Sequence, residues 1–236
     1  MRLHRFYTKE DLGSREMVLR DEAVLHQLRD VFRLAKGDRV IFFNGDSTDY
    51  IYEAKIVSKR EAGFVFVEKV PNIIPKKKIT LYMSLIKKDN FEMVLEKCTE
   101  IGVTHFVPVI TERTQNKNLN TERAEKIMKE ASEQCGRGDI PTLGETMNLE
   151  DVLKENPDVI IFDMAGKEIR SSKSETLNKS EILNEKKEIR ILIGPEGGWS
   201  DNEIKRFKDL KIQTFKLGDT VLRAETAAIV AAAKIF

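Results

Sequence analysis

Short apolar stretches separated by turn-forming residues fill the chain between residues 39 and 70. RVIFF (39–43), YIYEAKIV (50–57) and GFVFVEKV (63–70) are rich in β-branched and aromatic residues, which is typical of β-strands, and the turn-forming residues NGDST (44–48) follow the first of them. Upstream, residues 21–34 repeat apolar side chains at helical spacing. This pattern predicts a small β-barrel domain with one helix.

The rhythm changes after PNIIPKKK (71–78), which carries Pro71 and Pro75. We therefore place a linker near residues 71–77 and predict two domains, 1–72 and 73–236. Beyond the linker, apolar strands alternate with helices, which predicts an α/β fold with a parallel sheet covered on both faces. The strands are expected at 79–86, 105–110, 158–164 and 189–194, and the helices at 89–103, 121–137, 200–210 and 224–236.

Local signals refine two of these helices. Asp89 with Glu92, and Ser200 with Glu203, have the spacing of an N-cap residue followed by a carboxylate three positions later. The last helix, AETAAIVAAAKIF, is apolar on nearly every side and made mostly of small residues, which predicts tight burial. The stretch from Lys167 to Lys187 is interpreted as a surface connection.

The segment IRILIGPEGGWS runs from a buried strand directly into Gly194–Gly198 and then into the capped helix. Glycines allow positive φ and let a flat ligand approach the backbone, and ligands bind beyond the carboxyl ends of parallel strands. A plain strand-to-helix turn is the alternative. The spacing matches neither GxGxxG nor GxxxxGK[ST].

A second loop, with Gly218 at its start, leads into the last helix through Arg223 and Glu225. A carboxylate in the first helical turn has an ordinary explanation in the helix dipole. A cation there is unfavourable, so Arg223 is expected to face a negative group, either a protein carboxylate or a ligand. Because they are two residues apart, Arg223 and Glu225 cannot share a helix face, and we expect different roles.

Composition limits the classes of protein to which the chain can belong. With 236 residues, 41% hydrophobic and 33% charged, the chain is typical of a globular protein. No apolar run approaches a membrane span and the N-terminus lacks an apolar signal stretch, so a cytoplasmic protein without membrane contact is expected. The net charge of +1 argues against wholesale polyanion binding, but lysines flank the strand at 79–86, at Lys76–Lys78 and at Lys87 and Lys88.

Metal and thiol chemistry are not expected. Cys98 and Cys135 lie on predicted helices without CxxC spacing, which favours reduced core thiols over a disulfide or zinc site. His4, His26 and His105 are scattered without metal-ligand spacing. No set of residues for nucleophilic catalysis is apparent either.

Eight segments in order resemble the ribosomal RNA small subunit methyltransferase E family, a branch of the SPOUT methyltransferases. They are RFY (5–7), LHQLRDVFRLAKGD, FNGDSTDY, IKKDNFEMVLEKCTEIGV, TERTQ, EASEQCGR, LIGPEGGWS and LGDTVLRAETAA. The resemblance implies a PUA-like β-barrel, followed by a SPOUT α/β domain with a deep trefoil knot. It also implies a homodimer that uses S-adenosylmethionine to methylate N3 of one uridine, at position 1498, of 16S ribosomal RNA in the small ribosomal subunit.

In that family the cofactor lies against the loops of the knot. The resemblance thereby implies that the cofactor-binding residues here are Leu85, Ile193, Gly194, Pro195, Glu196, Gly197, Gly198, Leu217, Gly218, Val221, Leu222 and Ala227. One departure is visible, because the family usually has a basic residue where this chain has Asp219 and Thr220.

For methyl transfer to uracil N3, we expect Arg223 to stabilise negative charge on the base, and Glu225 to act as a base or only as a helix cap. Candidate RNA phosphate contacts are Arg2, Arg5, Lys76, Lys77, Lys78, Lys88 and Arg137. Methylation of another RNA nucleotide and a non-catalytic RNA-binding protein stay open as alternatives. A sugar- or phosphate-nucleotide enzyme lacks a supporting Lys-Ser/Thr pair or a metal-carboxylate cluster.

Overall fold

The computed structural model describes residues 3–168 and 188–236, and it divides into two compact units. The first unit comprises Met1–Ile74 together with Lys129–Ile140, and the second comprises Pro75–Met128 and Pro141–Phe236. The first break lies two residues after the predicted boundary at residue 72. The sequence pattern gave no indication that a segment after residue 128 clusters with the first unit. The predicted surface connection at Lys167–Lys187 falls almost wholly outside the described residues.

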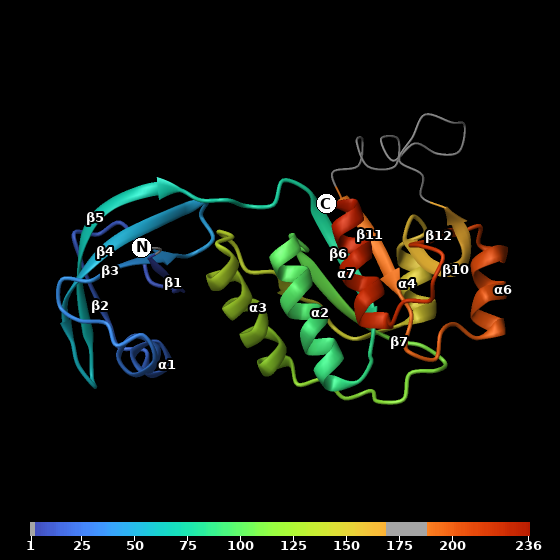
Figure 1. Cartoon of the computed structure of the whole chain (residues 1–236), viewed down its shortest axis with the longest axis horizontal. Helices are drawn as coiled ribbons and strands as arrows, with labels where there is room; N and C mark the ends of the chain where they lie inside the picture. The colour runs from blue at the N-terminus through green and yellow to red at the C-terminus, as the bar shows by residue number, and fades with distance from the viewer. Residues whose placement is uncertain (1–2, 169–187) are drawn as a thin grey trace. The chain divides into compact units, whose positions relative to one another are not determined.

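The first unit is a curved five-stranded sheet with the strand order β1-β3-β4-β5-β2 (Figure 1). Its strands are β1 (His4–Tyr7), β2 (Glu16–Leu19), β3 (Arg39–Phe43), β4 (Thr48–Val57) and β5 (Ala62–Pro71). Only the β1–β3 pair is parallel. The predicted helix is shorter than its pattern, because α1 (Glu22–His26) passes into a π-helical turn at Gln27–Val31.

Aromatic side chains fill the core of this sheet. Phe42 packs edge-on against Tyr52 and Phe64, with ring centroids 5.9 and 5.0 Å apart. All three rings are buried in one core, to which β3, β4 and β5 each contribute one of them. The small β-rich domain expected from the sequence is confirmed.

A buried ion pair joins distant parts of the first unit. The Arg5 Nη2 atom lies 2.8 Å from Asp49 Oδ1, and the two side chains are only 7% and 8% exposed. Arg5 also donates to the carbonyl oxygens of Gly136 and Arg137, and Asn72 donates to the same Asp49 oxygen. Burial raises the pKa of Asp49 in spite of these donors. The contacts tie β1 and β4 to the segment that follows α3.

The second unit has a seven-stranded parallel sheet with the order β12-β10-β11-β6-β7-β8, and β9 also pairs with β7. Its strands are β6 (Lys78–Ser84), β7 (His105–Ile110), β8 (Thr142–Leu143), β9 (Met147–Asn148), β10 (Ile160–Glu168), β11 (Glu188–Ile193) and β12 (Gln213–Lys216). The predicted parallel α/β sheet is confirmed. The strand order alone does not define how the loops thread, so the trefoil knot stays a prediction.

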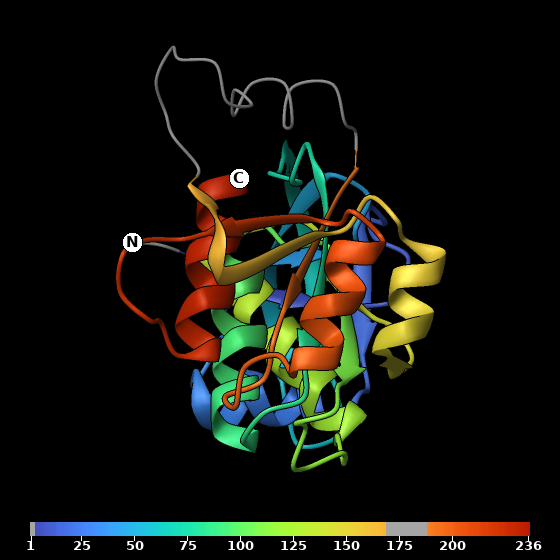
Figure 2. The ribbon, with the colours of Figure 1, turned by 90° about the vertical axis from the view of Figure 1, so that its right-hand side faces the viewer.

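Helices cover both faces of this sheet (Figures 1 and 2). They are α2 (Lys88–Ile101), α4 (Leu149–Glu155), α6 (Asp201–Asp209) and α7 (Ala224–Ile235), whereas α3 (Thr121–Cys135) begins in the second unit and ends in the first. Helices α2 and α7 pack together on one side, and α4 and α6 lie on the other (Figure 2). Ala228, Ala231 and Ala232 of α7 have no exposed surface, which confirms the tight burial predicted from its small residues. No helix among the described residues is both long and apolar enough to span a bilayer.

One predicted helix cap is confirmed and the other is wrong. Ser200 and Glu203 form a complete capping box, with Glu203 N donating to Ser200 Oγ at 3.1 Å and Ser200 N donating to Glu203 Oε2 at 2.8 Å. The cap predicted at Asp89 is wrong, because α2 starts earlier and its N-cap is Lys87. The Lys87 amide donates instead to Glu196 Oε1 at 2.9 Å, so the glycine-bearing loop is fixed to the start of α2.

Candidate functional site

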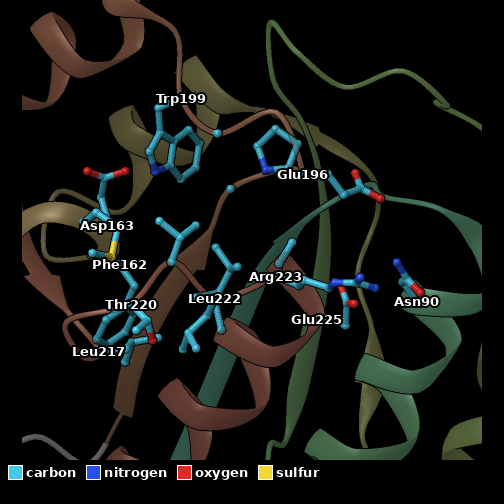
Figure 3. Close-up of a pocket in the computed structure, with 18 of the residues that line it drawn as sticks. Asn90, Phe162, Asp163, Glu196, Trp199, Leu217, Thr220, Leu222, Arg223 and Glu225 are labelled. Carbon is cyan, nitrogen blue, oxygen red and sulfur yellow. The ribbon is translucent and has the colours of Figure 1, made fainter.

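Two loops that are far apart in the sequence line one cavity at the carboxyl ends of β10 and β11. Residues 194–198 follow β11 and residues 217–223 join β12 to α7. The cavity has a volume of about 510 Å³, within the range of small-molecule sites. Its position beyond the ends of parallel strands is where open α/β sheets bind ligands. The structure thus brings together the two loops that sequence analysis singled out (Figure 3).

Most of the residues predicted to bind a cofactor line this cavity. Nine of the twelve do so: Ile193, Gly194, Pro195, Glu196, Gly198, Leu217, Val221, Leu222 and Ala227. The other three do not. Leu85 is buried, with its amide bonded to the Val109 carbonyl, Gly197 turns its carbonyl to Arg113, and Gly218 is exposed. These three predicted cofactor-binding residues thus lie outside the cavity wall.

Hydrogen bonds hold the loop after β11 in shape. Gly198 has a φ of +67°, a conformation that favours glycine, and its amide donates to the Pro195 carbonyl at 2.9 Å. Arg113 Nη1 donates to the Gly197 carbonyl at 2.7 Å, and Ser84 Oγ donates to the Ile193 carbonyl at 2.8 Å. The loop is therefore fixed from β6, β7 and α2 before any ligand binds.

Gly194 is the position in the loop that leaves least room for a side chain. A Cβ atom there would lie 2.9 Å from Trp199 Cε2 and 3.0 Å from Trp199 Cζ2. The indole is held edge-on by Phe207, with centroids 5.0 Å apart, and is 5% exposed. It can move only by displacing its own neighbours.

We therefore expect Gly194→Ala to destabilise the protein by about 1–3 kcal/mol through overpacking. We also expect a weaker affinity for any ligand that lies along this loop. Urea unfolding and ligand titration calorimetry would measure the two effects. The matched control is Gly218→Ala, where no atom lies within 4 Å of the added methyl group and φ is not strained. Equal behaviour of the two variants would refute the assigned role of Gly194.

One end of the cavity is mainly apolar, although the Asp163 carboxylate also lies there (Figure 3), and most of its residues were not predicted as site residues. Phe162, Met164 and Trp199 line this end together with Leu217 and Leu222. Phe162 and Met164 belong to β10, where the pairing with β12 shifts register after Phe162. Their signal was available, because they end the apolar strand that the pattern predicted. What the pattern did not reveal is that β10 lies next to β11.

The other end of the cavity is polar. Lys87, Asn90, Glu196, Arg223 and Glu225 line it, and the N-termini of α2 and α7 meet there (Figure 3). Helix N-termini carry partial positive charge, so this end favours ligand groups that are negative or become negative. The sequence pattern predicted Arg223 and Glu225 as site residues but not Asn90, which lies in the first turn of α2.

The two predicted catalytic side chains lie in this polar end but differ in exposure. Arg223 is the N-cap of α7, makes no side-chain cap bond and is exposed. Glu225 is 6% exposed, and its Oε2 atom has no hydrogen-bond partner among the described residues. No ion pair of 4.0 Å or less joins these two described side chains, so each can bind a separate ligand group. This arrangement agrees with the expectation of different roles.

The loop that departs from the family pattern is held by its own contacts. Asp219 Oδ1 accepts from Lys216 Nζ at 2.8 Å, and Lys234 Nζ donates to the Leu217 carbonyl at 2.7 Å. Thr220 lines the cavity. The loop is therefore anchored at both ends, although neither of these two positions carries a basic residue.

The predicted RNA contacts divide into three groups. Arg2 lies outside the described residues. Arg5 and Arg137 are corrected: Arg5 is paired with buried Asp49, and the Arg137 guanidinium is 5% exposed and bonded twice to Asp139 at 2.9 Å. A phosphate would have to displace these carboxylates. The lysines fit better, since Lys76, Lys78 and Lys88 are exposed and Lys77 is partly so.

The sequence predicted neither thiol nor metal chemistry for the cysteines and histidines. Cys98 is a buried free thiol, and burial raises its pKa to about 12, which makes it a poor nucleophile. Cys135 is also free. His105 Nδ1 lies 2.7 Å from Thr142 Oγ1, a structural contact. In the part of the chain that the structure describes, no three His, Cys, Asp or Glu residues are grouped as metal ligands.

Known proteins resemble the chain over nearly its full length. A family model for an RNA methyltransferase domain matches residues 74–236. Ribosomal RNA small subunit methyltransferase E of Rickettsia conorii is 28% identical, covering 100% of this chain and 96% of the relative. The protein of the same name from Synechocystis is 32% identical, covering 90% of this chain and 70% of the relative.

Solved structures agree in fold. A Legionella pneumophila protein in complex with the cofactor SAM has a TM-score of 0.84 and 28% identity, covering 100% of this chain and 97% of the other. Ribosomal RNA small subunit methyltransferase E from Neisseria gonorrhoeae, bound to S-adenosyl methionine, has a TM-score of 0.84 and 25% identity, covering 98% and 96%. The similarity extends over both units of the chain.

Proposed function

Because the chain belongs to the ribosomal RNA small subunit methyltransferase E family, we propose that it transfers a methyl group from S-adenosylmethionine to N3 of uridine 1498 in 16S ribosomal RNA. The observation that carries this proposal is the cavity that the two loops, 194–198 and 217–223, line together. An apolar end and a polar end in one cavity suit a reaction that joins a nucleoside cofactor to a polar base.

The residues of the cavity fit the cofactor. Apolar side chains at one end, above all Phe162 and Trp199, offer a surface for a flat adenine ring. Gly194 lines the cavity, and a side chain at this position would collide with the Trp199 indole. Nine cavity residues match the positions that the family resemblance assigns to cofactor binding. When bound, S-adenosylmethionine supplies an electrophilic methyl group on a sulfonium.

The polar end supplies the groups that act on the base. Uracil N3 is weakly acidic, and negative charge spreads onto its two carbonyl oxygens as the proton leaves. Arg223, together with the N-termini of α2 and α7, stabilises that charge. Because N3 lies on the Watson–Crick edge, the uridine has to be unpaired or flipped out of a helix.

The RNA around the target uridine needs further contacts. The exposed side chains of Lys76, Lys78 and Lys88, with partly exposed Lys77, can bind phosphates. We further propose that the small ribosomal subunit or its RNA is the partner, that the protein works as a homodimer, and that it acts in the cytoplasm with the ribosomes. The dimer rests on the family resemblance.

The competing function is a non-catalytic RNA-binding protein. It would explain the lysines but gives no role to the cavity. Titration calorimetry with S-adenosylmethionine separates the two. We expect saturable 1:1 binding per chain, which is weakened in Gly194→Ala and unchanged in Gly218→Ala. Absence of any binding heat for the native protein across several temperatures would favour the RNA-binding alternative.

A further inference from the structure

Among the carboxylates that line the cavity, Glu225 is the one with a buried oxygen that has no hydrogen-bond partner among the described residues. Its side chain is 6% exposed, and this oxygen is Oε2. Leaving a charged oxygen unpaired costs more than a typical hydrogen bond gains, so such groups usually have a functional reason. Because Glu225 lines the cavity, a ligand that brings an N–H donor would remove this cost.

Two donors lie in the same polar end of the cavity. Arg223 contributes a guanidinium and Asn90 a side-chain amide, and both line the cavity wall with Glu225 (Figure 3). Asn90 is half-buried in the first turn of α2, and Arg223 is exposed at the start of α7. Helices α2 and α7 pack together, so the side chains at their N-termini face one ligand space. Two of these side chains, Asn90 and Arg223, are hydrogen-bond donors, and Glu225 is an acceptor.

A uracil ring has the complementary pattern on its Watson–Crick edge. O4 and O2 accept hydrogen bonds, and N3–H between them donates. We propose that Asn90, Glu225 and Arg223 read this imide edge: Glu225 accepts the N3–H bond, and the Asn90 and Arg223 side chains donate to the two flanking carbonyls. This inference rests on the proposed function and assigns the residues that recognise the base. Cytosine is rejected because its N3 has no proton for Glu225 and its exocyclic amine opposes a donor.

The charge around the site favours the base over the positively charged parts of the cofactor. The N-termini of α2 and α7 carry partial positive charge, and Lys87 and Arg223 add full charges. The Glu196 and Glu225 carboxylates line the same end and offset those two full charges, so the helix N-termini leave it with a small net positive charge. A neutral imide that loses its proton would be stabilised by that charge, and Glu196 Oε1 already accepts a hydrogen bond from the Lys87 amide.

The same contact gives Glu225 a chemical role. Its carboxylate takes the N3 proton and becomes a carboxylic acid, while the N3 electron pair forms the new N–CH₃ bond. The S–CH₃ bond breaks, and its electron pair stays on sulfur to give a neutral thioether. The proton on Glu225 then passes to water. Every atom and charge is accounted for with S-adenosylmethionine as the only co-reactant.

The test uses small subunits reconstituted with 16S RNA that carries uridine, cytidine or 5-bromouridine at the target position. Bromine withdraws electrons and makes N3 more acidic, so less help is needed to remove its proton. We expect Glu225→Gln to lose methylation of uridine by about 10²–10⁴-fold, the typical contribution of a single general base, and to recover much of it with 5-bromouridine. The substitution keeps the shape of the side chain, so the fold is expected to persist.

A second readout needs no turnover. Without cofactor, fluorescence anisotropy should show that the native protein binds uridine particles more tightly than cytidine particles. Asn90→Ala and Glu225→Gln should each reduce this preference by roughly 5- to 100-fold, the effect of leaving a buried polar group unpaired. In turnover, Asn90→Ala should raise KM more than it lowers kcat. Glu100→Gln, an exposed carboxylate on α2, is the matched control.

The outcomes separate the inference from the proposed function. If the native protein methylates no particle, the proposed function is wrong. If it methylates uridine but 5-bromouridine gives Glu225→Gln no recovery, the proton-accepting role is wrong. If both variants keep the native preference for uridine over cytidine in binding, the edge-reading role is wrong as well.

Discussion

Replacing Arg223 with alanine is expected to lower kcat for ribosomal RNA methylation by about 10²–10³-fold, the effect of removing one preorganised donor from a transition state. The affinity for S-adenosylmethionine should change little, because Arg223 lies at the polar end of the cavity, away from Phe162 and Trp199 (Figure 3). Single-turnover methylation with labelled cofactor measures the first quantity, and calorimetry measures the second.

The conservative variant Arg223→Lys sharpens this prediction. Lysine keeps the charge but loses the planar fork of donors, so partial recovery of kcat is expected. Arg206→Ala on α6 is the control, because its side chain is 46% exposed and pairs with Glu150 on the far side of the sheet. Catalytic efficiency of Arg223→Ala equal to that of the native protein would remove Arg223 from the mechanism.

The second large effect concerns stability. Asp49→Ala leaves the buried Arg5 guanidinium without its carboxylate, and breaking a buried pair in this way costs about 3–5 kcal/mol. Arg5 also donates to the Gly136 and Arg137 carbonyls, so the loss loosens the link between β1 and residues 129–140. Urea unfolding of the full chain, followed by a probe in the first unit, measures the change.

Two further variants test the cause of that effect. Asp49→Asn retains an oxygen acceptor for Arg5 and Asn72, so a smaller loss is expected than with alanine. The exposed pair Arg20–Glu61, whose side chains are 73% and 42% exposed, serves as the control, and Glu61→Ala should cost less than about 1 kcal/mol. Losses of equal size for Asp49→Ala and Glu61→Ala would contradict the stabilising role of the buried pair.

The pKa of Asp49 adds a pH dependence with a defined sign. Burial raises this pKa above its ordinary value of 3.8, so the folded state binds the proton more tightly than the unfolded state. The contribution of Asp49 to stability is therefore greatest below that ordinary value and declines as the pH rises through the raised pKa. In Asp49→Asn this decline should be missing from the pH profile of unfolding.

Regular elements of the fold were predictable because their signals are local. The apolar runs that became β6, β7, β10 and β11, and the small-residue helix α7, lie where the pattern placed them. The Ser200–Glu203 cap was also read correctly. The Asp89 cap failed because α2 is capped from a distance, by Glu196, which is 109 positions from Lys87.

Candidate site residues were predictable where a loop carried its own signal. The glycines at 194–198 and the Arg223–Glu225 helix start are of this kind. Phe162 and Asn90 were missed because their roles depend on which strands are neighbours and on where the start of α2 meets that of α7. Strand order and helix packing are tertiary properties that one sequence does not specify locally.

Charged side chains gave the clearest errors. Arginine is a residue type that often contacts RNA phosphates, but Arg5 and Arg137 each pair with a carboxylate in the fold. The partner of Arg5 is 44 positions away in the sequence, so only the folded sheet reveals it. No ion pair joins Lys76, Lys77 or Lys78 to a carboxylate among the described residues, and these lysines are exposed or partly so, as surface lysines usually are.

The cavity lined by residues 194–198 and 217–223 is expected to be the site at which the protein methylates a uridine of the small ribosomal subunit. Mass-spectrometric nucleoside mapping of 16S RNA, from cells with and without this protein, measures this directly. We expect 3-methyluridine at the target position only where the native protein is present, and its absence when Arg223→Ala replaces it. An identical modification pattern in both cell lines would contradict the account.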